Sequence, residues 1–538
     1  MFASSESGLI HLPCCSLSSP ADKTRLASNV ITTYQAYRNV EDSIDDKIVL
    51  VESLWTKVEI QLRFLDKITS HMNEELAKSH FNLLQKLKGK LLQTVSQLES
   101  TSLGGTSIRQ KTSDFLKKWK FAIVRSSLDE LVAELEAWQQ RFDPTWYLII
   151  LISGNVLDSE LLRSQQNNAT GSDQKTGPLD NMLALRSALK SEPTIGCKGG
   201  SPNANLHLDA SGLKGSKETA IPFTTARATM RFRSSKLLII ESVAIPSGAI
   251  AQVKVDIENL ARKLQQIDPE IFGLLQCYGL LKRRDPTTNR LTTIEVVYRA
   301  PPSHGTPNTL RHHLLKQEPT SLSTIMRIAK QMVRSVSYTH TCDFVHKNIR
   351  PENILIFPNN DSSFGPSSLV GFTQFRNAHF QTNLCGDSAW NRNLYRHPQR
   401  QGTFVQERYV MQHDIYSLGV CLLELGLWRS FVWYPTHDSS ASPVPGVALG
   451  LSISDKDFEA VHSTTPLRIK EHLVAVAKKE LPPRVGDIYT DIVLACLTCL
   501  DPGNVAFGSD EELRDEDGIV IGVRFVENIL GRINEISI

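Results

Sequence analysis

A long polar stretch, residues 153–220, limits most strongly what this chain can fold into. It is rich in Ser, Asn, Gly, Lys and Thr, as in SQQNNATGSDQKTGPLDN and GCKGGSPNANLHLDASGLKGSKET. Such a segment cannot bury enough apolar surface to offset the entropy lost on ordering, so we interpret it mostly as a linker, with one short helix expected over LDNMLALRSALKS. Because 538 residues also exceed a single hydrophobic core, the chain is predicted to be multidomain.

The part before the linker, residues 1–152, is predicted to be an all-α helical bundle. Its apolar residues recur every three or four positions, first in DDKIVLVESLWTKVEIQLRFLDKI and then in HFNLLQKLKGKLLQTVSQLES. Two further helices are expected over TSDFLKKWKFAIVR and SLDELVAELEAWQQRF. Amphipathic helices joined by short connections bury their apolar faces by packing against one another, which favours an antiparallel bundle.

The part after the linker, residues 221–538, mixes strands and helices and is predicted to be α+β. KLLIIES and TTIEVVYRA have the composition of strands, whereas AIAQVKVDIENLARKLQQI and SLSTIMRIAKQMVRSVSYTH have helical periodicity. HDIYSLGVCLLELGLW is apolar on nearly all sides, which is typical of a helix inside a core.

Composition excludes several classes of protein. The net charge of +2 gives no global attraction for nucleic acid, and no apolar run is long enough to span a bilayer as a helix. The nine cysteines are scattered, and Cys496 and Cys499 form a lone CxxC that suits a turn of buried helix better than a zinc site, which needs a second ligand pair. The first twenty residues make a poor signal peptide, so we expect a cytoplasmic protein.

One motif in the α+β region resembles a known family. FVHKNIRPENIL is similar to the protein-kinase catalytic loop H-R-D-L-K-P-E-N-I-L, with His346 and Asn353 at matching positions. Further on, QHDIYSLGVCLLELGLW resembles the kinase helix whose aspartate, here Asp414, braces that loop. LYRHPQRQ stands where kinases end the activation segment. The resemblance implies a bilobal protein kinase-like fold, with a small lobe over about 221–300 and a large lobe over about 301–538.

The residues that transfer phosphate in kinases are missing from the matching positions. Asn348 replaces the catalytic aspartate, and an amide carries no charge and takes up no proton at neutral pH. Lys347 replaces the arginine before it. In SSLVGFTQF, Gly371 stands at the magnesium-binding aspartate, and glycine offers no side-chain oxygen. An inserted hairpin, FPNNDSSFGPSS, explains the long spacing between Asn353 and Gly371.

The small lobe has lost its nucleotide-binding residues as well. No glycine-rich loop precedes KLLIIES, so no flexible backbone is available to cover phosphates. Our alignment puts Ser242 at the position of the strand lysine, while Lys236 and Lys254 lie on either side without a matching context. Glu258 stands at the helix glutamate that normally pairs with that lysine, or is simply a solvated helix residue.

These losses predict a pseudokinase for which no catalytic residue is assigned and no metal or cofactor is expected, with binding of ATP and magnesium left open as the alternative. In kinases the residues that match His346, Asn353 and Asp414 also support the loop by hydrogen bonds, so the resemblance implies an architectural role for them. Arg350 either pairs with an acidic or phosphorylated group or is an ordinary surface cation. A protein partner is expected, of unknown identity.

The order of bundle, linker and kinase-like region resembles a fungal family in which a HeLo-type domain precedes a kinase-like domain. LEAWQQRFDPTWYLIILI resembles the end of such a bundle, and LPPRVGDIYTDIVLACLTCL and GVRFVENIL resemble the closing helices of those kinase-like domains. The resemblance implies a role in fungal non-self recognition (heterokaryon incompatibility) or cell death. A basic helix over 107–125 suits either an anionic membrane surface reached on activation or the solvated face of a bundle.

Three hypotheses follow. The leading one is a signalling pseudokinase that senses or binds a partner and controls the helical bundle. The second is an atypical active kinase that binds ATP through a migrated lysine such as Lys236 or Lys254. The third is a membrane-active helical effector.

Overall fold

We describe the protein from a computed structural model. It covers 206–209, 218–230, 236–245, 250–302 and most of 304–537, together with single helical positions before residue 206. The gaps after residue 304 are 343, 360–363, 373–375, 378–384, 388, 405–407, 436–441, 451–465, 505 and 508–518. The chain divides into two compact units, Met1–Gln140 and Arg141–Ile538.

The first unit is described at five helical positions, among which Phe64 is buried and Gln139 Nε2 donates to Gln61 Oε1 over 3.4 Å. Most of the predicted bundle over 1–152, including the basic helix over 107–125, lies outside the described residues and stays a prediction. In the second unit, the rings of Phe142 and Trp146 stack 6.0 Å apart and are buried.

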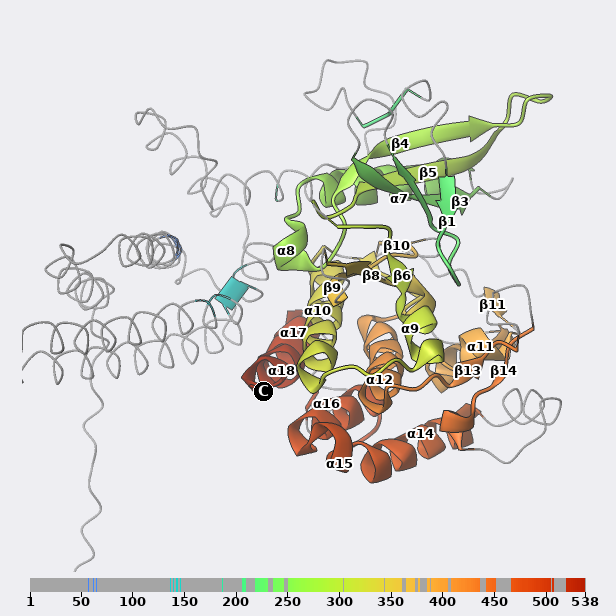
Figure 1. Cartoon of the computed structure of the whole chain (residues 1–538). Helices are drawn as coiled ribbons and strands as arrows, with labels where there is room; N and C mark the ends of the chain where they lie inside the picture. Colours follow the sequence, from blue (N-terminus) through green and yellow to red (C-terminus); the bar gives the residue numbers. More distant parts are fainter. Residues whose placement is uncertain are drawn as a thin grey trace, which may run out of the picture. The chain divides into compact units, whose positions relative to one another are not determined.

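A five-stranded antiparallel sheet forms the small lobe of the second unit, in the order β1-β2-β3-β5-β4 (Figure 1). At its centre, β3 pairs with β5 so that Ile240 faces Val297 and Ser242 faces Glu295. Both strands are rich in β-branched residues, which fit a pleated, buried surface. The strands are β1 (Glu218–Ala220), β2 (Arg227–Met230), β3 (Leu237–Ala244), β4 (Cys277–Arg284) and β5 (Leu291–Arg299).

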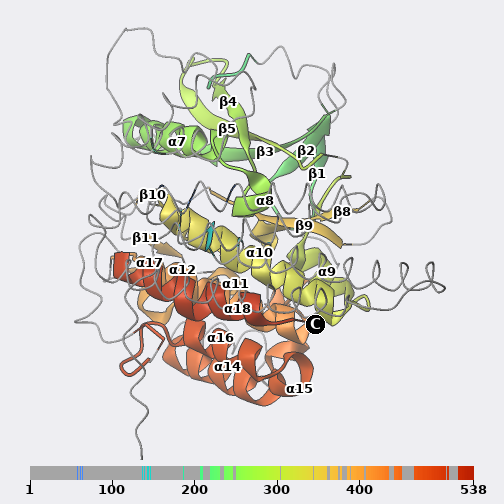
Figure 2. The same cartoon turned by 90° about the vertical axis from the view of Figure 1, so that its left-hand side faces the viewer.

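The helix α7 (Ile250–Gln265) runs beside this sheet, and the short α8 (Pro269–Phe272) leads from it into β4 (Figure 2). The free edge of β4 is covered by residues 206–209: Leu208 N donates to Leu280 O over 2.8 Å and Leu280 N to Leu206 O over 2.7 Å. Leu208 packs on the small-lobe core formed by Leu238, Ile240, Leu281 and Val297. Within the predicted linker 153–220, residues 206–209 and 218–220 are thus part of the sheet.

The large lobe is mainly helical (Figures 1 and 2). Its centre is α12, which is buried from Gln412 to Leu427 and packs against α10 and α16. Its helices are α9 (Leu310–Lys316), α10 (Leu322–Thr341), α11 (Trp390–Asn393), α12 (Met411–Leu427), α14 (Pro466–Glu480), α15 (Pro482–Val485), α16 (Asp487–Leu497), α17 (Ile519–Phe525), the π-helical η7 (Val526–Gly531) and α18 (Arg532–Glu535), with 3-10 turns η4 (Pro351–Asn353), η5 (Pro398–Arg400) and η6 (Val447–Leu449).

Short strands complete the large lobe around the loop that follows α10. The three-stranded sheet β6-β8-β9 carries the predicted inserted hairpin between β8 and β9, and three two-stranded pairs join β7 to β10, β11 to β12 and β13 to β14. The strands are β6 (Asn308–Thr309), β7 (Phe344–Val345), β8 (Ile354–Pro358), β9 (Phe364–Leu369), β10 (Arg376–Asn377), β11 (Cys385–Asp387), β12 (Gly402–Phe404), β13 (Val432–Trp433) and β14 (Val444–Pro445).

The α+β character predicted for the second part of the chain is confirmed. KLLIIES and TTIEVVYRA lie in β3 and β5, and the three predicted helices become α7, α10 and α12. Cys496 and Cys499 are free and buried in and just after α16, and Cys499 Sγ lies 3.2 Å from Gln412 O. Within the part of the chain that the structure describes, no helix combines the length and the apolar character needed to cross a bilayer.

Candidate functional site

The loop after β7 is held in place by Asp414 of α12, whose carboxylate is fully buried. It accepts the backbone N–H of His346 over 2.7 Å and of Lys347 over 2.9 Å, and the hydroxyl of Tyr409 over 2.6 Å, while His340 Nε2 lies 3.2 Å away. Burial alone would raise the pKa of Asp414, but these partners outweigh it and lower that pKa. This bracing contact is the one that the kinase resemblance implied for Asp414.

His346 is a neutral structural residue. Burial lowers its pKa to about 4, so the imidazole is uncharged at neutral pH. Its Nδ1 accepts the backbone N–H of Asn348 over 3.3 Å, which leaves the proton on Nε2, 3.1 Å from Val370 O. Between His346 and Asn348, Lys347 has a positive φ of 63°, which makes the sharp turn of the loop.

Asn348 closes the loop with its amide. Its Nδ2 donates to Gly371 O over 3.3 Å, and its backbone carbonyl oxygen accepts Asn353 Nδ2 over 2.7 Å. Both amide groups therefore make contacts within the loop. At position 348 the loop therefore presents an amide where kinases have the carboxylate that accepts the proton of the substrate hydroxyl.

A side chain at Gly371 would fit only if the side chain of Asn353 moved. The φ of Gly371 is +91°, which L side chains rarely adopt, and a Cβ built on it would lie 2.4 Å from Asn353 Cγ. The replacement of aspartate by glycine at position 371 thus removes a metal ligand, and in addition the amide of Asn353 occupies the space that an aspartate at 371 would enter.

Glu241 of β3, which the sequence analysis overlooked, reaches this point from the small lobe. Its carboxylate is buried and accepts the backbone N–H of Gly371 and, over 3.0 Å, the hydroxyl of Tyr298. Burial raises the pKa of Glu241 to about 7, although both hydrogen bonds act to lower it. The available signal was a glutamate inside the otherwise apolar strand LLIIESVA.

Ser242, predicted at the lysine position, lies on the opposite face of β3 because side chains alternate along a strand. It accepts Arg227 Nη2 over 3.2 Å. Arg227 and Arg283 hold the carboxylate of Glu295 between them, at 2.7 Å and 2.8 Å. The structure therefore does not bring Ser242 together with Asn353 and Gly371, and Glu241 is the β3 residue that contacts Gly371.

Glu258 of α7 has three basic partners, of which Lys254 lies on α7 itself and the other two lie outside it. Its carboxylate lies 3.2 Å from His207, 3.7 Å from Lys282 and 3.9 Å from Lys254. Burial acts to raise the pKa of Glu258, and these partners together lower it. Lys254 is thus engaged with Glu258, and Lys236 is an exposed residue just before β3.

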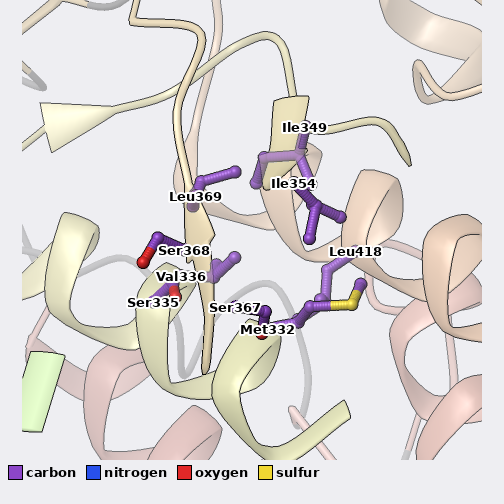
Figure 3. Close-up of a pocket in the computed structure, with 9 residues that line it drawn as sticks. All are labelled: Met332, Ser335, Val336, Ile349, Ile354, Ser367, Ser368, Leu369 and Leu418. Atoms are coloured by element: carbon purple, nitrogen blue, oxygen red, sulfur yellow. The ribbon is translucent and has the colours of Figure 1, made fainter. Parts of the chain in front are cut away.

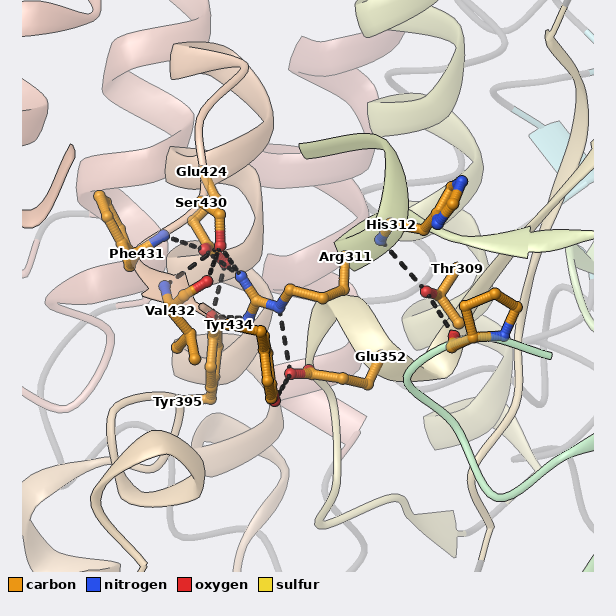
Figure 4. Close-up of polar contacts among 11 residues, drawn as sticks. Thr309, Arg311, His312, Glu352, Tyr395, Glu424, Ser430, Phe431, Val432 and Tyr434 are labelled. Atoms are coloured by element: carbon orange, nitrogen blue, oxygen red, sulfur yellow. Dashed lines mark hydrogen bonds and ion pairs between the residues drawn. The ribbon is translucent and has the colours of Figure 1, made fainter. Parts of the chain in front are cut away.

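Arg350 lies half-buried beside a charged network in the large lobe, and its charge helps to lower the pKa of Glu352. At the centre of the network is Arg311 of α9, which is fully buried (Figure 4). Arg311 Nε donates to Glu352 over 3.1 Å and Nη1 to Glu424 over 2.8 Å, and Tyr395 and Ser430 accept further N–H groups. The network joins α9, the loop and α12, and was not predicted.

A cavity beneath the loop leaves no room for a ligand. It has a volume of about 10 Å³, enough for one water molecule, and lies between α10, α12 and β9 (Figure 3). Met332, Leu369 and Leu418 are among its apolar lining residues.

The residues present do not fit a magnesium-nucleotide site. In kinases the catalytic-loop asparagine, here Asn353, and an aspartate at the position of Gly371 hold the magnesium ions. Asn353 can still offer its amide oxygen, but Gly371 has no side chain, and Glu241 is occupied by Tyr298 and a backbone N–H. Among the described residues, no group of three or more His, Cys, Asp or Glu could hold a metal ion.

Comparison with known proteins supports the kinase-like fold. Residues 303–445 match the protein kinase domain family, so the second part of the chain contains a protein kinase-like domain.

Three kinases from other organisms are similar to part of this chain. A probable serine/threonine-protein kinase of Dictyostelium discoideum is 29% identical over 118 residues (22% of this chain, 6% of the relative). The serine/threonine/tyrosine-protein kinase HT1 of Arabidopsis thaliana is 30% identical over 119 residues (22% and 28%). Cyclin-dependent kinase 4 of Ovis aries is 25% identical over 202 residues (36% and 59%). The chain thus spans less than two thirds of the length of each.

Proposed function

We propose that the kinase-like domain is a pseudokinase: a signalling module that binds or senses a protein partner and does not transfer phosphate. The observation that carries this proposal is the contact between Asn353 and Gly371, because the amide fills the space of the missing metal-binding aspartate. The amide at Asn348 and the buried contact of Glu241 with the Gly371 backbone support the same conclusion.

The assignment of the helical part and of the biological role rests on sequence resemblance. The helical part over 1–152 is a HeLo-type bundle that the kinase-like domain controls, and the protein acts in the cytoplasm in fungal non-self recognition or cell death. Neither nucleic acid nor a cofactor takes part.

The test is nucleotide binding measured by thermal shift on the full-length protein. Addition of ATP and magnesium is expected to leave the melting temperature unchanged, because a ligand raises it only by binding the folded state. A saturable rise that requires magnesium, together with phosphate transfer to the chain or to a generic substrate, would establish the competing hypothesis of an atypical kinase. An active kinase assayed in parallel is the positive control.

A further inference from the structure

A large groove lies on the kinase-like domain apart from the loop described above. Its volume is about 1840 Å³, and its lining residues come from the start of β3, β4 and α8 on the small-lobe side and from α10 and β9 on the large-lobe side. Figure 2 shows where these elements lie. The connection between the lobes forms part of its wall through residues 300–302 and 304–306. Asn348, Asn353 and Gly371 do not line it.

The wall on the large-lobe side is fixed by hydrogen bonds. His304 of the connection lies 3.2 Å from Asn359 of the inserted hairpin, through Nε2 and Oδ1. Gln331 Oε1 of α10 accepts both the backbone N–H and the hydroxyl of Ser367, over 2.9 Å and 2.7 Å. The hairpin inserted between Asn353 and Gly371 thus forms a wall of this groove that hydrogen bonds hold in place.

Two further contacts support the same wall. The guanidinium of Arg327 donates to the carbonyls of Phe364 and Gly365. A Cβ on Gly365 would lie 2.6 Å from Phe357 O, so the hairpin is closely packed at that point. A preformed groove loses less entropy when it binds a ligand than a groove that must first be ordered.

The residues that line the groove carry an excess of positive charge. Four basic side chains line the groove, Lys236, Arg299, Arg327 and Arg334, against the single carboxylate of Asp268. Arg299 is exposed, donates to Gln276 Oε1 over 2.9 Å and lies 5.1 Å from the ring centroid of Tyr278. This local excess stands out in a chain with a net charge of only +2. It complements a negatively charged ligand.

The size and the remaining lining residues indicate what kind of ligand fits. Ligand pockets for small molecules measure about 300–1,000 Å³, which is well below the volume of this groove. Apolar side chains such as Leu237, Pro301 and Phe364 alternate in the lining with polar ones. Extended peptides are bound by such combinations of apolar contacts and hydrogen-bonding groups.

We propose that this groove binds an extended acidic peptide segment of a partner protein. The proposal gives the partner-binding role proposed above a surface and a partner chemistry. Because the groove does not share its lining with the loop at Asn348, peptide binding tests the groove, whereas the nucleotide experiment tests the loss of phosphate transfer.

The experiment is selection from a random dodecapeptide library displayed on phage, with the full-length protein as bait. We expect the enriched peptides to carry more acidic than basic residues. An enriched peptide, synthesised with a fluorescein label, is then titrated by fluorescence anisotropy at two salt concentrations. The Kd is expected to rise at the higher salt concentration, because ions screen exposed charges.

Charge reversal locates the binding site. The double variant Lys236→Glu/Arg299→Glu is expected to raise the Kd about tenfold or more, since both side chains are exposed and line the groove. The control Arg290→Glu/Lys479→Glu makes the same change of charge at exposed residues outside the groove and should leave the Kd unchanged. Thermal unfolding of both variants verifies that they are folded.

The proposal is wrong if no peptide is enriched or if the enriched peptides are neutral or basic. It is equally wrong if the groove variant binds as well as the native protein, or if the control variant weakens binding to the same extent.

Discussion

At the scale of single residues, the side chains of the loop that resembles a catalytic loop contact one another and the adjacent Gly371. Asn348, Asn353 and Gly371 hydrogen-bond or pack against one another, and Glu241 adds a carboxylate from β3. Of these four, the sequence pointed to the first three, because a motif fixes their order along the chain. Glu241 could not be found in this way, since which face of β3 turns toward Gly371 depends on the packing of the two lobes.

The raised pKa of Glu241 predicts that stability falls with increasing pH. The folded pKa of about 7 exceeds the ordinary value of 4.5, so the stabilisation is fully present below pH 4.5 and is lost as the pH rises through 7. Glu241→Gln should remove this dependence and raise stability at pH 8 by on the order of 3 kcal/mol. Denaturant unfolding of the native protein and the variant between pH 5 and pH 8 measures the free energy of unfolding of each. If the two free energies changed in parallel with pH, the role of Glu241 would be refuted.

A second prediction separates backbone strain from crowding at Gly371. Gly402 also has a positive φ, of +84°, but nothing lies within 4 Å of a Cβ built there. Gly402→Ala should therefore lower the free energy of unfolding by about 1 kcal/mol, through backbone strain alone. Gly371→Ala adds the collision with Asn353 and should lower it by about 2–4 kcal/mol.

Removal of Asn353 supplies the internal check. In the Asn353→Ala background the extra cost of Gly371→Ala should shrink by about 1 kcal/mol or more, because the two side chains no longer collide. Additive losses of stability in denaturant unfolding would show that the contact with Asn353 is unimportant.

At the scale of elements, the apolar patterns of the sequence predicted β3, β5, α7, α10 and α12, since period and composition are local properties. The buried network around Arg311 was not predictable in the same way. Its members are separated by up to 119 residues, and a sequence alone does not show which charged residues meet in a core.

This network should make α9 essential to the large lobe. Arg311→Ala leaves Glu352 and Glu424 buried without their cation, which is expected to cost about 3–5 kcal/mol. Arg532→Ala, which breaks the exposed pair with Asp491, should cost at most about 1 kcal/mol. Equal shifts in melting temperature for the two variants would contradict a structural role of the network.

At the scale of the whole molecule, the sequence predicted an α+β kinase-like domain but placed residues 206–209 in a linker. Their attachment to β4 depends on two backbone hydrogen bonds at Leu280 and on the packing of Leu208, neither of which leaves a periodic signal in so short a segment. His207 of this segment also lies 3.2 Å from Glu258, so the chain leading into the domain contacts α7.

Leu208→Ser should loosen this attachment without unfolding the domain. We expect faster hydrogen exchange of the Leu280 amide, which donates to Leu206 O, and unchanged exchange in the pairing of β2 with β3. The control Leu322→Ser alters an exposed leucine and should change neither. Unaltered exchange at Leu280 would show that the segment does not depend on Leu208.

The fit between Gly371 and Asn353 also bears on how such a chain can evolve. An aspartate that returned to position 371 would meet the side chain of Asn353, which a working site needs as well. Under the proposed function, an aspartate that returned alone would therefore have to displace the side chain of Asn353 before it could help to hold a metal ion. Such a single reversion would cost stability and restore no activity, so phosphate transfer, once lost from a loop of this kind, is hard to regain.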